Sequence, residues 1–439
     1  GQGSGGAVDE AIEAARADGV LIEREYRQQR LIPAFMEPRS VVVDPTGEQI
    51  TMWSATQIPH ILRYLLAATT GVSESKIRVI APDVGGGFGG KLQSTPEEWI
   101  TFLAARRTGK PCKYTETRSE SLMASHHGRD QWQRLTLAAK KDGTVTGIKV
   151  DLLADLGSYV SLVGGGVPVL GAFMFNAIYK FPAYQFKVQT VLTNKTWTDA
   201  YRGAGRPEAT ALLERLVDQA SHELGIDPIE LRERNLLTDD VFPFTTLTGN
   251  VYDSGRYRLP LHTAADAIGY HELRREQAAR RERGDTVQFG IGVACYVEIT
   301  AGGGSSEFGR VEVHDDGSAT VYCGTLSHGQ GHQTAYAMLV SDQTGIPVDR
   351  IELVDGDTDR VPEGGGTGGS RSLQVGGSAV HRATEAMVDK ARALAARLLE
   401  ASEADIVVDT ERGTVGVAGV PAQALWWGEL AARAGELDG

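Results

Sequence analysis

The sequence has few cysteines and no way to group them. Its 439 residues contain only Cys112, Cys295 and Cys323, spaced far apart and without a CxxC pair. Disulfide frameworks, zinc sites and iron–sulfur clusters need several cysteines at short, regular spacings. We therefore expect none of these to be built from this chain alone, and the thiols fit a reducing compartment, the cytoplasm.

Long apolar runs and an excess of positive charge are also missing. No run of 18 apolar residues occurs, and the first residues lack the basic and apolar segments of a signal peptide. The formal net charge is -13 at pH 7, whereas nucleic-acid binding needs concentrated Lys and Arg. We expect no membrane span and no nucleic-acid partner. The opening GQGSGG, without Met, predicts an excised piece of a longer protein.

Glycine, in contrast, is abundant, with 53 residues gathered in clusters. Glycine loops let the backbone approach another molecule closely. Because the clusters are scattered along the whole chain, we expect one large ligand gripped from several sides. They lie at residues 85–90, 203–205, 301–304, 329–331 and 364–369.

Apolar periodicity and turn signals predict a mixed α and β fold of the α+β class. Residues 76–116 are typical of a strand, a helix and a second strand, with Ser94 as the helix N-cap, Glu97 completing a capping box and Gly109 ending the helix. Two Asp-Gly pairs predict β-hairpins. The pairs lie at 142–143 and 316–317, and longer helices are predicted over 208–224 and 380–399.

A charged stretch separates two glycine-rich halves of the chain. Residues 271–288 include HELRREQAARRERGD, which is typical of a charged helix or linker. We predict two mixed α/β subdomains, residues 1–270 and 289–439, on either side of it.

The sequence VGGGFGGK invites two familiar interpretations. A P-loop is excluded because Leu92 follows Lys91, where the motif needs a Ser or Thr hydroxyl for magnesium. A Rossmann fingerprint fits Gly85, Gly87 and Gly90, with Glu116 as a ribose ligand. A Rossmann-type NAD-dependent dehydrogenase therefore stays open as an alternative.

Two pairs of histidines are candidate metal ligands by residue type. His328 and His332 are four residues apart and could share one face of a helix as zinc ligands, but no third ligand is evident nearby. His126 and His127 are predicted to be structural. No metal ligation by side chains is expected.

Six segments, in a fixed order, carry a more specific resemblance. Together they resemble the molybdenum-cofactor-binding part of the large subunits of the xanthine dehydrogenase and aerobic carbon monoxide dehydrogenase family. The resemblance runs from EYRQQRLIP to the helix ending at Leu399, and it implies a molybdopterin dinucleotide, the cytosine form in bacteria, held between two cofactor-binding domains. The segments are SATQIPH, APDVGGGFGGK, TNKTWTDAYRGAGRPE, DPIELRERNLL, HGQGHQT and GDTDRVPEGGGTGGSRS.

The resemblance implies roles for individual residues. Gln57 resembles a glutamine that hydrogen-bonds an oxo ligand of the metal, and its plainer interpretation is a satisfied amide in a loop. Arg202 resembles an arginine that stabilises negative charge on the substrate or transition state, and its alternative is a structural ion pair. Phe88 resembles a residue of the loop beside the metal, and its plainer interpretation is packing in the hydrophobic core. The implied cofactor contacts are Gly86, Gly87, Phe88, Gly89, Gly203, Ala204, Gly329, Gln330, Gly331, His332, Thr367, Ser370, Arg371 and Ser372.

Three differences from the family's sequence pattern limit the substrates and the catalytic residues that we expect. Gly203 stands where carbon monoxide dehydrogenases have the copper-binding Cys of AYRCSFR, so CO oxidation is not expected. Leu92 stands where xanthine dehydrogenases contact the purine with Glu, so purine is not expected either. The family's catalytic Glu in a GxGE motif has no match before Gly439, and its N-terminal domain is missing too. We expect this chain alone to lack the general base.

The implied activity is hydroxylation of an electron-poor carbon, in an aldehyde or a heterocycle, with oxygen derived from water. Electrons would pass to [2Fe-2S] clusters on a small subunit and FAD on a medium subunit, in a dimer of heterotrimers. The alternative from another class is a catalytically incomplete module that only binds the cofactor.

Overall fold

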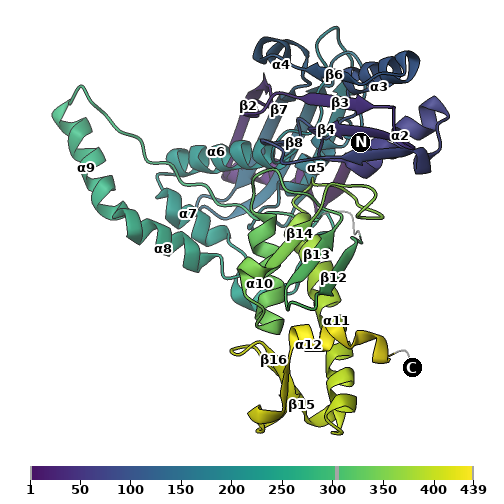
Figure 1. Ribbon diagram of the computed structural model, residues 1–439. Helices are drawn as coiled ribbons and strands as arrows, with labels where there is room; N and C mark the ends of the chain where they lie inside the picture. The colour runs from purple at the N-terminus through teal and green to yellow at the C-terminus, as the bar shows by residue number, and fades with distance from the viewer. Residues whose placement is uncertain (1, 302–305, 438–439) are drawn as a thin grey trace. The chain divides into compact units, whose positions relative to one another are not determined.

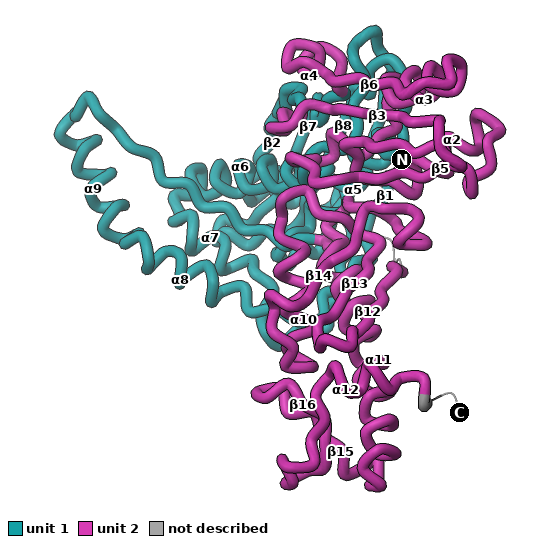
Figure 2. The backbone as a smooth tube through the Cα atoms, in the orientation of Figure 1, with its two compact units in different colours: residues 1–32, 126–298 teal, residues 33–125, 299–439 magenta. Residues whose placement is uncertain are grey.

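The structure, a computed structural model, describes residues 2–301 and 306–437 (Figure 1). The chain forms two compact units, each built from two separate stretches of sequence (Figure 2). Unit 1 comprises Gly1–Ile32 and His126–Glu298, and unit 2 comprises Pro33–Ser125 and Ile299–Gly439. The predicted glycine cluster at 301–304 lies, except for Ala301, outside the described residues. In the described part of the chain, no helix has the length and apolar character of a membrane span.

Both units combine helices with sheets, which confirms the predicted mixed fold class. The charged stretch at 271–288 begins within helix α9 (Tyr270–Arg283) and runs beyond it. The two units interleave in sequence, so they are not the same objects as the predicted subdomains 1–270 and 289–439. That division stays a prediction.

Unit 1 contains a five-stranded sheet in the order β1-β9-β8-β7-β2. Strands β8 and β9 are parallel, and the other neighbours are antiparallel. The predicted hairpin at Asp142-Gly143 is confirmed, and Gly143 has the positive φ, +89°, that its turn requires. The strands are β1 (Gln2–Gly5), β2 (Val20–Leu31), β7 (Gly128–Ala139), β8 (Val145–Asp155) and β9 (Tyr184–Val191).

Helix α6 (Arg206–Leu224) is the predicted helix over 208–224, begun two residues earlier. It contacts β2 and β7, and it buries Leu212, Leu213 and Leu216. Gly205 precedes it with φ +96°, a conformation that favours glycine. The other helices of unit 1 are α1 (Val8–Asp18), α5 (Val167–Met174), α7 (Pro228–Asn235), α8 (Arg258–Ile268) and α9, with a short hairpin of β10 (Phe244–Thr245) and β11 (Val251–Tyr252).

The first stretch of unit 2 contains a sheet in the order β5-β4-β3-β6. The predicted strand, helix and strand over 76–116 are confirmed as β5 (Ile77–Ile80), α3 (Pro96–Thr108) and β6 (Cys112–Thr115). The predicted cap is wrong by one residue: Thr95 is the N-cap and Glu98 accepts its backbone N–H at 2.8 Å. The reason is that Pro96, which lacks an N–H, occupies the first helical position. The remaining elements are β3 (Ser40–Asp44), β4 (Ile50–Ser54), α2 (Pro59–Thr70) and α4 (Arg118–Ala124).

The second stretch of unit 2 contains a sheet in the order β12-β13-β14, and α11 contacts two of its strands. The hairpin predicted at Asp316-Gly317 is confirmed between β12 and β13. Helix α11 (Ser378–Leu398) matches the prediction over 380–399, and its buried face packs with Val321 and Tyr336. The other elements are β12 (Gly309–Val313), β13 (Ala319–Cys323), α10 (His332–Thr344), β14 (Ile351–Val354), β15 (Ile406–Asp409), β16 (Thr414–Val417), β17 (Ala424–Trp426) and α12 (Trp427–Ala432).

Candidate functional site

Gln57 joins three loops of unit 2. Its side chain is buried, with the residue 4% exposed. Its Oε1 accepts the backbone N–H groups of Gly89 at 3.0 Å and Lys91 at 3.2 Å, and its Nε2 donates to the carbonyl oxygen of Thr367 at 2.7 Å. These bonds fix the carboxamide, because only the nitrogen can donate. One of the two Nε2 hydrogens takes no partner within residues 2–301 and 306–437.

The glycine loop at 85–90 wraps around this amide. A Cβ on Gly87 would lie 2.6 Å from Oε1 of Gln57, so no side chain fits there. Phe88 has a left-handed backbone, φ +56°, which is strained for a residue with a side chain. The residue as a whole is 45% exposed. Core packing, the alternative interpretation of Phe88, is therefore not what holds this strained loop in place.

An ion pair between a buried lysine and a partly exposed glutamate links the two ends of the same loop. Nζ of Lys91 lies 2.7 Å from Oε2 of Glu37, and the Lys91 side chain is 0% exposed against 35% for Glu37. The same oxygen accepts the N–H of Gly85 at 2.7 Å. Burial lowers the pKa of Lys91, and Glu37 opposes that shift. The pair thus ties both ends of the glycine loop together, a role that the sequence analysis missed.

The HGQGH segment presents two buried ring nitrogens that have no hydrogen-bond partner among the residues the structure describes. Oε1 of Gln330 accepts the backbone N–H of His328, so its Nε2 is the donor toward Nε2 of His332 at 3.1 Å. Burial lowers the pKa of His332 to about 4, so the ring is neutral at pH 7. Its single proton must then sit on Nδ1, which is buried and unpaired.

His328 contributes the second of these nitrogens. Burial lowers the pKa of His328 to about 4, and the Thr56 backbone opposes the shift. Its Nε2 is buried and has no hydrogen-bond partner among the described residues. Only His332 lies in α10, so the two rings do not share one helix face. The segment therefore supplies one free donor, on His332, and a second buried nitrogen on His328 that donates or accepts according to its tautomer.

The loop at 364–372 is held from within unit 2. The hydroxyl of Thr367 donates to the carbonyl of Leu326 at 2.7 Å and accepts its N–H at 3.0 Å. Arg371 pairs with buried Glu307 and donates to the carbonyl of Gly366 at 3.1 Å. Ser370 is exposed with φ +56°, and Ser372 begins a π-helical turn. Thr367 and Arg371 thus shape the loop, and dinucleotide contacts by this segment stay a prediction.

Unit 1 carries the remaining predicted residues. Arg202 is exposed in the loop before α6, and Gly203 and Ala204 follow with φ +91° and +41°. A Cβ on Gly203 would lie 2.3 Å from Cγ of Pro207. This loop therefore has no room for a cysteine at position 203.

The Rossmann alternative is excluded by the geometry of unit 2. The glycine loop ends at residue 90, but α3 begins only at Pro96, so the loop does not open a helix. Strands β5 and β6 lie at opposite edges of their sheet, not side by side. Glu116 is buried and pairs with Arg39 at 2.6 Å, so it is not presented to a ribose.

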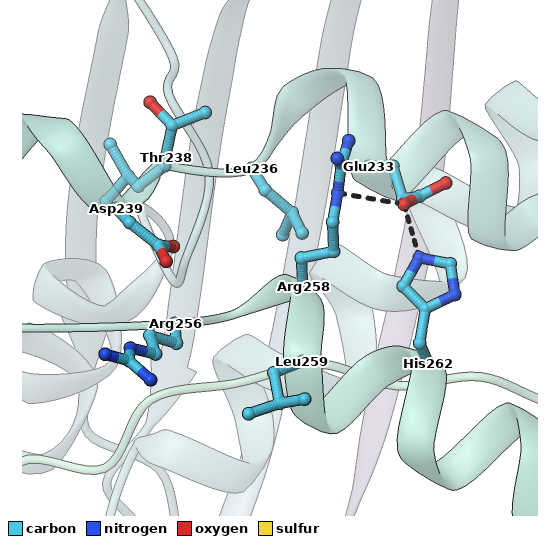
Figure 3. A pocket seen from close by; sticks show the side chains of 9 residues that line it. Glu233, Leu236, Thr238, Asp239, Arg256, Arg258, Leu259 and His262 are labelled. Carbon is cyan, nitrogen blue, oxygen red and sulfur yellow. Dashed lines mark hydrogen bonds and ion pairs between the residues drawn. The ribbon is translucent and has the colours of Figure 1, made fainter.

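A surface pocket of unit 1 is lined by α7, the segment after it and α8 (Figure 3). Arg258 and His262 point toward the same carboxylate oxygen of Glu233, at 3.1 and 2.5 Å. The Arg258 guanidinium and the Glu233 carboxylate form an ion pair, so the pocket does not present a free charge from either group. The lining contains none of the predicted site residues: it is Glu233, Leu236, Leu237, Thr238, Asp239, Arg256, Arg258, Leu259 and His262.

Comparison with known proteins identifies the family of the chain. Residues 2–236 match the family described as molybdopterin cofactor-binding domain, and residues 263–438 match a second family of the same description. The chain therefore belongs to the molybdopterin cofactor-binding domain family. This confirms the family predicted from the six sequence segments.

The relatives include several named enzymes. The chain is 34% identical to the carbon monoxide dehydrogenase large chain of Hydrogenophaga pseudoflava, over 90% of this chain and 51% of that protein. It is 32% identical to the nicotine 6-hydroxylase large subunit of Paenarthrobacter nicotinovorans, over 93% of this chain and 51% of that protein. The crystal structure of quinoline 2-oxidoreductase from Pseudomonas putida 86 superposes with a TM-score of 0.90 at 29% identity. The match covers 100% of this chain and 57% of that chain. The chain spans about half the length of the curated relatives it matches.

Proposed function

We propose that this chain is the cofactor-binding part of a molybdenum hydroxylase large subunit. The reaction is hydroxylation of an electron-poor carbon in a nitrogen heterocycle or an aldehyde, with oxygen taken from water. The observation that carries the proposal is the Gln57 carboxamide, fixed by three backbone hydrogen bonds beside the strained Phe88 loop. Its second N–H is a rigid donor for an oxygen ligand, as in oxyanion sites.

The proposed cofactor is molybdopterin cytosine dinucleotide, and the residues present fit such a group. His332 Nδ1–H and His328 Nε2 are buried polar groups that cost free energy without a partner. A pterin ring supplies both acceptors and donors, and a phosphate supplies acceptors. Gly329 and Gly331 have positive φ and open space around them, so the backbone there can approach a ligand closely. When bound, the cofactor supplies the metal centre that activates water and accepts two electrons.

The chain's own residues bind, orient and stabilise charge. Gln57 would donate to an oxygen of the metal centre, and Phe88 would line the approach for a flat or small substrate. Arg202 stabilises negative charge that develops on the substrate. Neither Gln57 nor Arg202 needs to transfer a proton in this role.

Carbon monoxide is not the proposed substrate. The copper ligand of that reaction would be a thiolate at position 203, where this chain has Gly203. A Cβ there would lie 2.3 Å from Pro207 in this loop conformation. Purines are disfavoured by Leu92, which cannot accept a hydrogen bond.

The electrons need a route, which we propose to be an iron–sulfur subunit with [2Fe-2S] clusters and an FAD subunit. One relative is named as a subunit of a dehydrogenase complex, 6-hydroxypseudooxynicotine dehydrogenase of Paenarthrobacter nicotinovorans. We propose a cytoplasmic dimer of heterotrimers.

The test is turnover by the purified full-length complex in water enriched in 18O, with a dye as electron acceptor. The panel is quinoline, nicotine, benzaldehyde, xanthine and carbon monoxide. We expect a hydroxylated product from a heterocycle or the aldehyde, with one 18O per product, and none from the last two. Oxygen taken from O2, or carbon monoxide as the sole substrate, contradicts the proposal. Bound molybdenum without any turnover favours the alternative of a cofactor-binding module.

A further inference from the structure

Strand β7 contains two consecutive left-handed residues near its start. Arg129 has φ +68° and Asp130 has φ +58°, and neither is a glycine. Left-handed backbone is strained for residues with a side chain, and it persists only where the surroundings enforce it. The pairing of β2 with β7 omits Asp130, although Arg129 pairs with Arg30 and Gln131 with Gln28. The strand therefore carries a local distortion that needs a reason.

The distortion aims the Arg129 side chain at the loop that carries Arg202. Its NH1 donates to the carbonyl oxygen of Tyr201 at 3.1 Å, and its NH2 donates to the carbonyl oxygen of Arg202 at 2.6 Å. The guanidinium carbon also lies 4.7 Å from the centre of the Tyr201 ring. The side chain is only 8% exposed. A buried arginine thus donates hydrogen bonds to two successive peptide carbonyls.

Glu208 binds both Arg129 and the other end of the loop. Its Oε1 lies 3.2 Å from NH1 of Arg129, and its Oε2 accepts the N–H of Gly205 at 2.9 Å. The carboxylate is 1% exposed. One buried ion pair therefore fixes the main chain at residues 201, 202 and 205. Arg202 itself keeps an exposed side chain.

The neighbouring Asp130 is held independently. Its Oδ2 accepts from Nε of Arg30 at 2.8 Å and from Nζ of Lys195 at 3.2 Å. Gly128, just before the distortion, has no room for a Cβ, which would lie 2.5 Å from Cβ of Tyr201. Packing and charge on both sides thus hold the strained pair of residues.

We propose that Arg129 is a positioning residue for Arg202: with Glu208, it locks the loop 201–205 so that the Arg202 guanidinium is presented in one orientation. This rests on the proposed function of Arg202. A planar guanidinium is required, because lysine offers a point charge that cannot bridge two carbonyls and a carboxylate in one plane.

The test is hydrogen–deuterium exchange, read by mass spectrometry, on the full-length complex with Arg129→Gln, Arg129→Lys and the control Arg134→Gln. Arg134 lies on the same strand and also pairs with a glutamate, Glu25, but both side chains are more than 60% exposed. We expect exchange in a peptide covering 200–206 to rise about tenfold or more in both Arg129 variants, with the 212–224 part of α6 unchanged. Arg134→Gln should change neither. Unchanged loop exchange, or equal loosening of loop and helix, overturns the proposal.

A double-variant cycle tests whether Arg129 acts through Arg202. With the substrate found by the panel, Arg129→Gln should lower kcat in the wild-type background but have little further effect in Arg202→Gln. An equal loss in both backgrounds overturns the proposal. If the wild-type complex turns over no substrate, the proposed function fails, and the exchange experiment still decides whether Arg129 positions the loop.

Discussion

Gln57 and Thr367 lie 310 positions apart in the sequence and hold each other by two hydrogen bonds. Nε2 of Gln57 donates to the Thr367 carbonyl at 2.7 Å, and the Thr367 N–H donates to the Gln57 carbonyl at 3.0 Å. The amide that the resemblance assigns to the metal is therefore also a structural link between two glycine loops. Its two roles predict different consequences of substitution.

Gln57→Glu should cost about 1–3 kcal/mol of stability, because a carboxylate cannot donate to the Thr367 carbonyl and leaves it unsatisfied. It should also lower the molybdenum content of the purified complex. Thermal unfolding and elemental analysis measure the two effects. Gln49→Glu, at a solvent-exposed amide, is the matched control. Full stability and full metal content in Gln57→Glu would contradict both roles.

The Lys91–Glu37 pair should respond asymmetrically to loss of each partner. Glu37→Gln leaves a wholly buried ammonium without its counter-charge, which should cost about 3 kcal/mol or more. Lys91→Met leaves a carboxylate that is 35% exposed, so the loss should be smaller, about 1–2 kcal/mol. Chemical denaturation of both variants gives the comparison. The exposed Glu25→Gln should cost under about 1 kcal/mol. Equal losses of stability in Glu37→Gln and Lys91→Met would show that burial of the ammonium does not determine the cost of breaking the pair.

Gly203→Cys should destabilise the protein without creating a copper site. Gly249 offers a matched control, because its φ is +87° against +91°, but a Cβ added there would meet nothing within 4 Å. Both variants carry the strain of a left-handed non-glycine residue, about 1 kcal/mol. Only Gly203→Cys adds the clash with Pro207, about 1–3 kcal/mol more. Melting temperatures and copper content check this, and stoichiometric copper in Gly203→Cys refutes it.

Stability should fall as the pH drops below 6.5, in part because of His332. Its pKa is lowered to about 4 in the folded chain, so between pH 6.5 and 4 the unfolded state binds more protons. The contribution of the neutral His332 ring to the free energy of unfolding is complete above pH 6.5 and is lost as the pH falls toward 4. Its size is about 2 kcal/mol after allowing for partial solvation of the ring. Asp355 acts in the opposite sense, since burial raises its pKa to about 6.

The variant His332→Phe isolates that contribution, because Asp355 is common to both proteins. Melting temperatures from pH 7 to 4.5, followed by circular dichroism, should fall less steeply in the variant. Parallel curves for the two proteins would mean that His332 is not held neutral.

Local patterns predicted the elements well, because caps and turns act over a few residues. The helix before Gly109 was found from its capping residues, and the error of one position arose from placing Pro96 at the second helical residue. The hairpins at 142–143 and 316–317 followed from Asp-Gly pairs alone. The interleaving of the two units was not accessible, since it depends on contacts between distant stretches of sequence.

The candidate site was only partly accessible for the same reason. The resemblance supplied Gln57, Arg202 and the glycine loops, but nothing near Arg371 signals its pairing with Glu307, 64 positions away. Arg129 was missed because a charged residue on a strand is usually solvated. The only hint was the adjacent charges of HGRD, which carry no sign of left-handed backbone.

The most direct test of the account is metal and nucleotide analysis of the purified full-length complex. Elemental mass spectrometry gives molybdenum and copper per large subunit, and acid hydrolysis releases the nucleotide of the cofactor for chromatography. We expect about one molybdenum, CMP as the released nucleotide, and no copper. Stoichiometric copper, or a complex that binds no molybdenum, would contradict it.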